Sequence, residues 1–340
     1  CALVISTPVS IVSGMAAATR GGILVKGGMF LEQGRLLRCL AFDKTGTLTC
    51  GRPRLTDMVP VHADEKRAVL LAASLAARSD HPVSRAVAEG VAAETAALLP
   101  VEDVEAVPGQ GMRGRMEGAR YALGSRRMMA ALGLDSPELE KRVTALETQG
   151  KTVAVLAGEE GVLALFAVAD TLRESSREAV RELKELGVHT VMLTGDNENV
   201  ARVIASQAGV DEYLAGLLPE DKLHAVERLA ARGGRVGMVG DGINDAPALA
   251  RADIGFAMAG GGTDTAMETA DVALMDDDVR KIPRFIRLSR ATYAILIQNI
   301  ALALGVKALF FALTFSGHAT MWMAVFADVG TALMVVANGL

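Results

Sequence analysis

The stretch LRCLAFDKTGTLT, residues 37–49, decides how this chain is expected to fold. Its first part, Leu37 to Phe42, is an apolar run that predicts a buried strand ending at Asp43. A polar turn containing glycine follows directly, which is typical of the carboxyl end of a strand in a parallel sheet covered by helices. We therefore expect an α/β fold whose chemistry begins at Asp43.

Two later stretches repeat this pattern of a strand followed by a polar turn. Strand-like Thr190 to Leu193 precedes TGD, residues 194–196, and strand-like Val236 to Val239 precedes GDGINDAP, residues 240–247. An Asp after a strand is more often a turn residue or helix cap, but three such turns in order predict one site at one edge of the sheet. The other elements expected in this domain are two helices and a strand, at Val200–Gln207, Asp221–Ala231 and Val272–Met275.

The residue types in these turns suit phosphoryl transfer. Asp43 can act as a metal ligand or as a nucleophile toward phosphorus, and with Asp241 it would hold one magnesium ion. Thr45 and Thr194 offer hydroxyls to phosphoryl oxygens, and Lys222 offers a positive charge to the same group. Because Thr45 cannot act as a general acid or base, the pattern favours a long-lived phosphoenzyme over rapid hydrolysis.

Both ends of the chain are apolar enough to lie in a membrane. The run from Ile295 to Phe315 contains one charge, Lys307, and a second run from residue 319 to 340 contains only Asp328. Each run is about the ~20 residues that a spanning helix needs, so we expect a two-helix membrane hairpin. The five Lys and Arg residues between 280 and 290 put the preceding soluble part in the cytosol.

The first residues predict a further membrane segment. Residues 1–19 are apolar but rich in small side chains, with Pro8 in the interior. This favours the second half of a spanning helix, broken at its proline and packed against other helices. The chain starts with Cys1 and has no basic region ahead of the apolar stretch, so a signal peptide does not fit and we expect an upstream part to be missing. The competing interpretations are that these runs are core helices of a soluble protein, and that Lys307 and Asp328 merely neutralise each other.

Composition excludes several classes of protein. The 340 residues are long enough for about two domains on a prior of ~150 residues each. A net charge of −5 provides no global positive field for nucleic acid, which we exclude as a partner. The three cysteines, Cys1, Cys39 and Cys50, include no close pair, which argues against a disulfide framework or a zinc module. We expect Cys39 and Cys50 to be small packing residues.

Taken together, these motifs resemble those of the P-type ATPases of the haloacid-dehalogenase-like superfamily. The strings that carry the resemblance are DKTGTLT (residues 43–49), TGDN (194–197), GDGINDAPAL (240–249) and SDHP (79–82), the last similar to the His-Pro signature of the heavy-metal branch. The resemblance covers essentially the whole chain. It implies a haloacid-dehalogenase-like Rossmannoid parallel sheet with an inserted α+β nucleotide-binding domain, phosphorylated by ATP on Asp43 with Mg²⁺ as cofactor.

The resemblance also implies roles for individual residues. The catalytic set is Asp43, Lys44, Thr45, Thr194, Gly195, Asp196, Lys222, Asn244 and Asp245, the magnesium ligands are Asp43, Thr45 and Asp241, and the ATP-binding residues are His81, Pro82, Gly109 and Gly111. GQGMRG, residues 109–114, also fits a dinucleotide-binding pattern, but we reject that interpretation because a strand-like stretch follows it. The family often has Glu five residues before its His, and Ala76 at that position implies a weaker hold on adenine.

The resemblance narrows the transported ion. CALVISTP looks like the tail of a Cys-Pro-Cys signature, so Cys1 would be a ligand, and its thiolate suits zinc, cadmium, lead or cuprous ion alike. Lys307 and Asp328 match the zinc, cadmium and lead class, and a carboxylate suits a borderline divalent ion. We therefore expect export of zinc, cadmium or lead, with a copper- or silver-exporting pump as the alternative.

The predicted organisation has four parts. They are a partial transmembrane helix with a linker (1–33), a phosphorylation domain (34–50 and 170–285), a nucleotide-binding domain (51–169) and a transmembrane hairpin (286–340). We expect a multi-pass cell-membrane protein with cytoplasmic catalytic domains, whose partners are membrane lipid, the transported ion and the missing actuator domain and earlier spans. Two rival functions are a membrane-anchored phosphatase of the same superfamily, which would need a carboxylate in place of Thr45, and a non-enzymatic nucleotide sensor.

Overall fold

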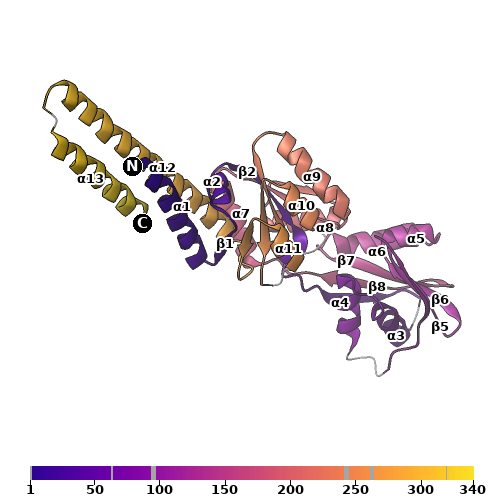
Figure 1. Ribbon diagram of the computed structural model, residues 1–340. Helices are drawn as coiled ribbons and strands as arrows, with labels where there is room; N and C mark the ends of the chain where they lie inside the picture. Colours follow the sequence, from indigo (N-terminus) through magenta and orange to yellow (C-terminus); the bar gives the residue numbers. More distant parts are fainter. Residues whose placement is uncertain (1, 63, 93–96, 241–244, 261–263, 319) are drawn as a thin grey trace. The chain divides into compact units, whose positions relative to one another are not determined.

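The structure, a computed structural model, describes the chain apart from residues 1, 63, 93–96, 241–244, 261–263 and 319 (Figure 1). It divides into two compact units, which are described separately. The first unit consists of Cys1–Phe42, Glu178–Thr190 and Lys222–Leu340, and the second of Asp43–Arg177 and Val191–Asp221.

The first unit is built on a mostly parallel sheet. Its strands are, in order across the sheet, β1 (Ile23–Val25), β13 (Val272–Leu274), β12 (Ile254–Met258), β11 (Arg235–Gly240) and β2 (Leu37–Asp43). Strand β1 runs antiparallel to β13, and the other neighbouring pairs are parallel. Strands β11 and β12 are buried along nearly their whole length, as expected where helices cover both faces of a parallel sheet. The strands predicted from residues 37, 236 and 272 onward are confirmed.

Short helices accompany this sheet. They are α2 (Gly28–Gly34), most of α7 (Glu174–Glu185), α9 (Pro219–Ala231), α10 (Ala246–Arg251) and α11 (Asp264–Thr269). Helix α9 confirms the helix predicted at 221–231, and it buries Ala225, Val226 and Leu229 on one side. This spacing of one, three and four residues is the apolar stripe of a helix that covers a core.

Helix α12 (Lys281–Phe315) is longer than the span predicted from the sequence. It includes the basic stretch ahead of the apolar run, and this first part packs on the sheet. The ring of Phe285 meets that of Phe256 edge-on with 5.4 Å between centroids, and Arg287 forms an ion pair of 2.6 Å with Glu182 of α7. The apolar run is thus the continuation of a helix that starts beneath the parallel sheet.

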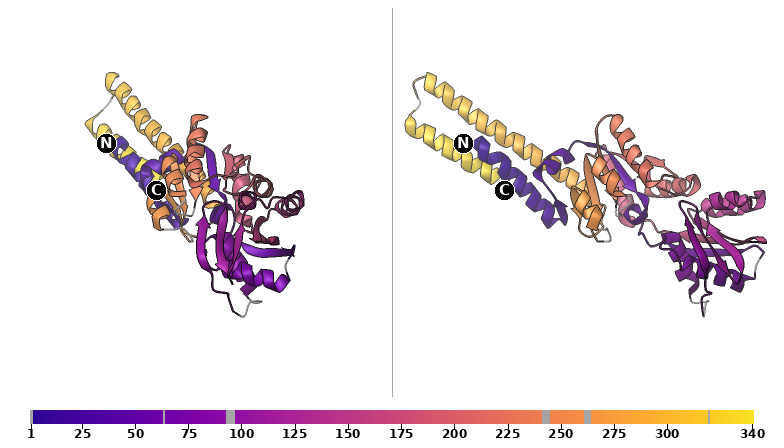
Figure 2. Two further views of the ribbon diagram at one scale, coloured as in Figure 1. Left: turned by 90° about the vertical axis from the view of Figure 1, so that its right-hand side faces the viewer. Right: turned by 45° about the vertical axis from the view of Figure 1, so that its right-hand side comes forward.

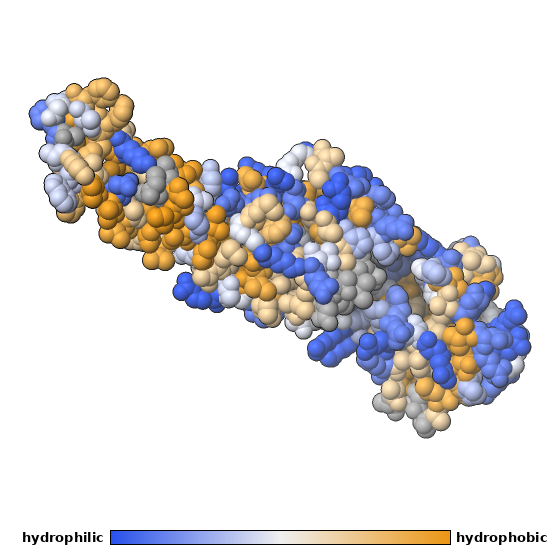
Figure 3. Space-filling model, in the orientation of Figure 1, coloured by the Kyte–Doolittle hydropathy of each residue, from blue (hydrophilic) through white to orange (hydrophobic). Residues whose placement is uncertain are grey.

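Helices α12 and α13 (Met321–Gly339) have the length and the apolar composition that a membrane-crossing helix needs. Their most apolar stretches are only 17% and 11% buried. Figure 3 shows hydrophobic side chains gathered over this end of the unit, and Phe315 and Trp322 are among the most exposed. This exposure argues against core helices of a soluble protein, which would be mostly buried.

Helix α1 (Ala2–Arg20) packs alongside α12 and α13 (Figure 2). The predicted break at Pro8 is wrong, because the described helix continues through it. Proline removes one backbone hydrogen bond from the helix ladder. Asn299 of α12 links the three helices: it donates to the carbonyl of Val335 in α13 (3.1 Å) and lies 3.4 Å from the hydroxyl of Ser10 in α1.

The second unit contains a six-stranded antiparallel sheet. Its strand order is β3 (Arg54–Pro60), β8 (Gly161–Ala169), β7 (Thr152–Gly158), β6 (Ala119–Gly124), β5 (Gly111–Met116) and β4 (Glu102–Val107). Helices α3 (Glu65–Ala76) and α4 (Pro82–Val91) cover one face, and α5 (Arg126–Ala131) and α6 (Pro137–Glu147) cover the other (Figure 1). Alternate residues of β7 enter the two cores: Ala154 and Leu156 join α3 and α4, whereas Val153 and Val155 join α5 and α6.

Along the chain this region runs β3, α3 and α4, then β4 to β6, then α5 and α6, and then β7 and β8, which agrees with the α+β composition expected for the inserted domain. Strand β3 was not predicted, because RLTDMVP carries polar residues and a proline and lacks a clear alternation. It pairs antiparallel with β8. An edge strand with only part of its side chains buried leaves a weak sequence signal.

The second unit also contains the end of β9 (His189–Leu193), α8 (Glu198–Ala208) and β10 (Glu212–Leu214), with β10 parallel to β9. These elements confirm the predicted strand at 190–193 and helix at 200–207. Asn197 caps α8, its side chain accepting hydrogen bonds from the backbone of Asn199 and Val200. Gly209 ends the helix with a φ of +76°, a conformation that favours glycine.

Candidate phosphorylation and ion sites

Asp43 is the last residue of β2 and is only 5% exposed. Strand β2 pairs in parallel with β11, and Phe42 lies opposite Val239. The next residues along the two strands are Asp43 and Gly240, so the DKTGTLT and GDGINDAP turns follow neighbouring parallel strands. This is the arrangement that the sequence predicted for two of the three turns.

The turn after Asp43 is fixed by distant side chains. Gly46 has a φ of +76°, which lets the chain reverse direction without strain. Arg173 donates from Nε to the carbonyl of Thr49 (2.9 Å) and from its terminal nitrogen to the carbonyl of Gly46 (3.1 Å). Ser176 donates to the carbonyl of Leu48 (2.8 Å). The carbonyls of the turn are therefore held in place.

Asp170 holds the exit from the same turn. Its carboxylate accepts hydrogen bonds from the hydroxyl of Thr49 (2.5 Å) and from the backbone N–H of Gly51 (3.2 Å) and Arg52 (3.3 Å). Hydrogen bonds to a carboxylate are stronger than those between neutral groups. The segment 170–176 therefore acts as a clamp on residues 46–52, and we call it the loop clamp.

Within the turn, Lys44 forms an ion pair with Asp196 at 2.6 Å. The two side chains are 11% and 16% exposed. Burial acts to lower the pKa of Lys44, but the attraction and hydrogen bond of Asp196, with smaller effects of Asp170 and Asp43, outweigh it and raise the pKa above its usual value. Lys44 therefore stays charged and ties the DKTGTLT turn to the TGD turn.

The TGD turn is shaped by its own backbone. The N–H of Asp196 donates to the hydroxyl of Thr194 (3.1 Å), whose side chain is buried. The N–H of Gly216 donates to the carbonyl of Asp196 (2.7 Å), and that of Leu217 to the carbonyl of Thr194 (3.0 Å). A Cβ at Gly195 would lie 3.2 Å from the carbonyl oxygen of Leu217, so glycine suits this close approach.

The first unit holds a second lysine–aspartate pair. Lys222 donates to Asp245 at 2.7 Å, and the side chain of Asp245 is 3% exposed. A Cβ at Gly240 would lie 2.8 Å from the Cβ of Asp245, so the glycine before Asp241 makes room for this carboxylate. Asp241 and Asn244 lie outside the described residues, and their predicted roles stay predictions.

The predicted ATP-binding residues lie in the second unit. His81 caps α4 by accepting a hydrogen bond from the N–H of Val83 (3.3 Å), with Pro82 in the first turn. Partial desolvation of the imidazole lowers the pKa of His81, and the negative charge of Asp196 acts in the opposite direction. His81 thus lies within electrostatic reach of the TGD turn, and Ala76 is fully buried at the end of α3.

Glycine suits the two predicted positions, 109 and 111, for different structural reasons. A Cβ at Gly111 would lie 2.4 Å from the Cα of Gly124, so close packing of β5 against β6 requires glycine there. Gly109 has a φ of +69° in the turn between β4 and β5, and its nearest neighbour would be Leu218 at 3.9 Å. Backbone at Gly109 is therefore approachable, which suits contact with a ligand. The strand that follows excludes the dinucleotide-binding pattern.

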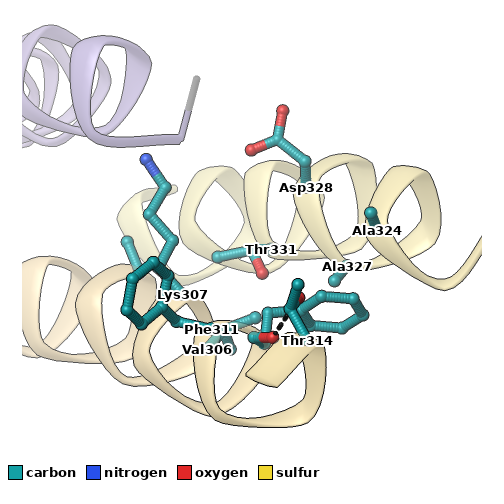
Figure 4. Close-up of a pocket in the computed structure, with 10 residues that line it drawn as sticks. Val306, Lys307, Phe311, Thr314, Ala324, Ala327, Asp328 and Thr331 are labelled. Atoms are coloured by element: carbon teal, nitrogen blue, oxygen red, sulfur yellow. Dashed lines mark hydrogen bonds between the residues drawn. The ribbon is translucent and has the colours of Figure 1, made fainter. Parts of the chain in front are cut away.

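A cavity of 280 Å³ lies between α12 and α13, and both predicted charged residues line it (Figure 4). Lys307 extends from α12 and Asp328 from α13, and both point toward the same side of the helix pair. The rest of the lining is mainly apolar, with the hydroxyls of Thr314 and Thr331. Cys1 lies outside the described residues, so its predicted role as a ligand stays a prediction.

Sequence reasoning missed several residues in and around the DKTGTLT turn, residues 43–49. Arg173 and Asp170 were not selected because their contacts span more than a hundred residues of sequence. Thr47 is fully buried, and its hydroxyl has no hydrogen-bond partner among the described residues. The position of Thr47 inside the DKTGTLT string could have marked it as a candidate site residue. The expectation that Cys50 is a packing residue is wrong, since it is exposed, whereas Cys39 is half-buried.

The residues of the turn fit magnesium and phosphate. Three carboxylates, those of Asp43, Asp170 and Asp196, act on the single charge of Lys44, which leaves a net negative environment. The described residues contain no cluster of three or more His, Cys, Asp or Glu side chains in metal-binding geometry, and magnesium does not need one, because it prefers one or two carboxylates with water and phosphate oxygens. Thr45 is half-buried in a turn whose other residues are buried, so part of this residue remains accessible to solvent.

Comparison with known proteins agrees with this geometry. A family model described as haloacid dehalogenase-like hydrolase matches residues 37–253. A probable cadmium-transporting ATPase of Alkalihalophilus pseudofirmus is 45% identical over 347 aligned residues, covering 100% of this chain and 48% of the relative. A zinc/cadmium/lead-transporting P-type ATPase of Escherichia coli is 44% identical over 344 residues, covering 100% of this chain and 46% of the relative.

A solved structure is similar over the same extent. The crystal structure of a zinc-transporting PIB-type ATPase in the E2.Pi state has a TM-score of 0.75 and 42% identity, covering 100% of this chain and 55% of that chain. The chain belongs to the haloacid dehalogenase-like hydrolases and, within them, to the P-type ATPases, and these relatives are named as transporters of cadmium, zinc or lead. It spans about half the length of the curated relatives that it matches.

Proposed function

We propose that the protein containing this chain exports a divalent heavy-metal ion, zinc, cadmium or lead, across a membrane at the expense of ATP. The buried Asp43 at the end of β2, in a turn held by Lys44 and the loop clamp, carries this proposal. A carboxylate held at the end of a strand is a suitable nucleophile toward phosphorus.

In the proposed reaction, a carboxylate oxygen of Asp43 attacks the γ-phosphorus of ATP. A bond forms between that oxygen and phosphorus, the bond to the bridging oxygen of ADP breaks, and ADP leaves. Thr45 and Thr194 donate hydrogen bonds to the transferred group. Magnesium, when bound, supplies positive charge that offsets the repulsion between carboxylate and phosphate, and Asp43, Thr45 and Asp241 would hold it.

Two features support a divalent heavy-metal ion as the cargo and a membrane as the location. Lys307 and Asp328 line one cavity between two helices with the composition of membrane spans. A carboxylate suits zinc, cadmium or lead better than cuprous ion. We infer a multi-pass membrane protein with its nucleotide-binding and phosphorylation domains (51–169, and 34–50 with 170–285) in the cytoplasm, assisted by an actuator domain and further spans.

The first test is phosphorylation of the full-length protein by ATP labelled on the γ-phosphate. We expect an acid-stable phosphoprotein that Asp43→Asn abolishes. Asp135→Asn removes an exposed carboxylate from the same unit and should leave labelling unchanged. Labelling that survives in Asp43→Asn would exclude this residue as the phosphoryl acceptor.

The second test measures ATP hydrolysis by the full-length protein with zinc, cadmium, lead or silver ions. We expect stimulation by one or more of the divalent ions, and its loss in Asp328→Asn. Stimulation by silver or cuprous ion alone would overturn the class of ion and favour a copper- or silver-exporting pump.

A further inference from the structure

Two threonines line the cavity between α12 and α13, and they differ in how their hydroxyls are used. Thr314 donates to the carbonyl of Phe310, four residues earlier, at 2.9 Å. This bond to its own helix is the usual arrangement for a threonine within a helix. The hydroxyl of Thr331 has no hydrogen-bond partner among the described residues, although the side chain is only 4% exposed.

An unpartnered hydroxyl at this depth is unfavourable for stability. Buried polar groups are nearly always paired, because desolvation without a compensating hydrogen bond costs free energy. An unpaired one therefore calls for a functional explanation. The nearest candidate partner, the backbone carbonyl one turn earlier, is not used here, in contrast to Thr314.

The position of Thr331 suggests what the hydroxyl is for. It follows Asp328 by three residues in α13, a spacing that puts two side chains on the same face of a helix. Both residues line the cavity that Lys307 borders from α12, and Figure 4 shows Thr331 in the space between the two helices. A neutral oxygen thus lies one helical turn from the carboxylate that the proposed function assigns to the ion.

We propose that the hydroxyl oxygen of Thr331 is a further ligand of the transported ion, and that it helps to select among divalent ions. The inference rests on the proposed function, since it assigns a new group to the same ion site. A hydroxyl is a hard, neutral donor, which contributes more to binding of zinc than of the softer cadmium, for which thiolate ligands dominate. Loss of this oxygen therefore weakens zinc binding more than cadmium binding.

The test uses ATP hydrolysis by the full-length protein, titrated with zinc and separately with cadmium. Thr331→Val removes the hydroxyl and keeps the shape, so we expect the zinc concentration for half-maximal stimulation to rise about tenfold, as for loss of other groups that support a metal site. The cadmium concentration should rise less. Thr331→Ser keeps the oxygen, so the zinc concentration for half-maximal stimulation should shift much less than in Thr331→Val.

Two further measurements separate binding from structure. Thr19→Val is the matched control, because the hydroxyl of Thr19 donates to the carbonyl of Met15 in its own helix α1 and does not line the cavity, and we expect unchanged metal dependence. Thermal stability of Thr331→Val should be equal to or above that of wild type, because replacing an unpaired buried hydroxyl by a methyl group removes a desolvation cost. A ligand role thus predicts weaker metal binding without weaker folding.

The outcomes are distinct. Wild-type zinc dependence in Thr331→Val, or equal shifts in the Val and Ser variants, would overturn the role of Thr331 while leaving metal export intact. A shift that comes with loss of thermal stability would also overturn it, in favour of a packing role. Failure of the proposed function itself would be seen in the wild-type protein, as an absence of stimulation by any divalent heavy-metal ion.

Discussion

The DKTGTLT turn (residues 43–49) and the cavity between α12 and α13 use polar groups in opposite ways. In the turn, the carbonyls of Gly46, Leu48 and Thr49 are all bonded to the loop clamp, and Lys44 is paired with Asp196. In the cavity, the hydroxyl of Thr331 is buried without a described partner.

The difference matches the two kinds of chemistry that we propose for these sites. Phosphoryl transfer gains most from groups that are already fixed where charge develops, since they need no reorganisation during the reaction. An ion site in a transporter must bind its ion and later release it, so a group that exchanges partners is useful there. Five predictions test whether the turn and the residues next to it are held as firmly as this comparison requires, and whether the helices around the cavity are held by other means.

The largest effect is expected for the Lys44–Asp196 pair. Lys44→Met leaves Asp196 buried without its cation and should lower the free energy of unfolding by about 3–5 kcal/mol. Because the two residues form one pair, Asp196→Asn combined with Lys44→Met should cost less than the sum of the single variants. Denaturant unfolding of the full-length protein measures both; additive effects would contradict the pair.

The pH dependence of the same pair has a defined sign. The pKa of Lys44 is raised above 10.5 in the folded protein. Its contribution to stability is therefore fully present below pH 10.5 and is lost as the pH rises through the higher, folded-state pKa. The difference in stability between wild type and Lys44→Met should shrink as the pH rises through that alkaline range, and a difference that stays constant there would contradict the prediction.

The next effect concerns the loop clamp. Arg173→Ala removes two hydrogen bonds to carbonyls of the turn and should cost about 1–3 kcal/mol of stability. The loosened turn should also give a lower steady-state level of phosphoenzyme. Arg177→Ala removes the same side chain from an exposed position four residues later and serves as control. Equal phosphoenzyme levels in both variants would mean that the clamp does not position Asp43.

A smaller effect is expected where the three membrane-associated helices meet. Asn299 is fully buried, donates to the carbonyl of Val335 and accepts from Asn338 (2.9 Å). Asn299→Leu should lower stability by about 1 kcal/mol, in the range for hydrogen bonds between membrane helices. Thermal inactivation of the detergent-solubilised protein gives the measurement. An unchanged inactivation temperature would show that packing alone holds α1, α12 and α13 together.

The smallest effect is expected for Glu147, which contacts Asn197 directly after the TGD turn. Its carboxylate accepts from Asn197 (2.7 Å) and lies 3.2 Å from Arg126. Burial raises the pKa of Glu147 above 4.5, and Arg126 and the two asparagine side chains offset this only in part.

This raised pKa has a measurable consequence. Since the folded protein binds the proton more tightly, ionised Glu147 costs stability above its folded-state pKa, and the cost disappears as the pH falls toward 4.5. We expect Glu147→Gln to gain stability relative to wild type at neutral pH, by under about 1 kcal/mol, and to lose this advantage near pH 4.5. Thermal unfolding of both proteins across this range measures the difference; curves that stay parallel would contradict it.

Local patterns in the sequence predicted the strands and the sites that follow them. The run Leu37 to Phe42 ends where β2 meets its turn, because an apolar stretch followed by a glycine-containing turn constrains the backbone within a few residues. The contacts of Arg173 and Asp170 were beyond such reasoning, since they join residues far apart in sequence. Strand β3 was missed because its polar residues give only a weak strand signal. The helix through Pro8 was missed because a proline usually interrupts a helix.

The cavity between α12 and α13 shows the same division between residues that the local sequence predicts and residues that only the structure reveals. Lys307 and Asp328 were predicted because a charge inside an apolar run is conspicuous. Thr331 was not, because a threonine is common in any helix, and only its burial without a hydrogen bond distinguishes it from the exposed Thr314. Whether a hydroxyl finds a hydrogen-bond partner depends on the three-dimensional structure, and the neighbouring sequence does not reveal it.

The continuity of α12 has a mechanical consequence. Phe285, packed against Phe256, and Lys307 belong to one uninterrupted helix, and at 1.5 Å per residue they stand roughly 33 Å apart along its axis. A tilt of about 10° at the sheet would therefore displace the cavity end by roughly 6 Å, assuming a straight helix of this rise. Small rearrangements beneath the parallel sheet are thus amplified, by leverage alone, into movements as large as an ion and its ligands.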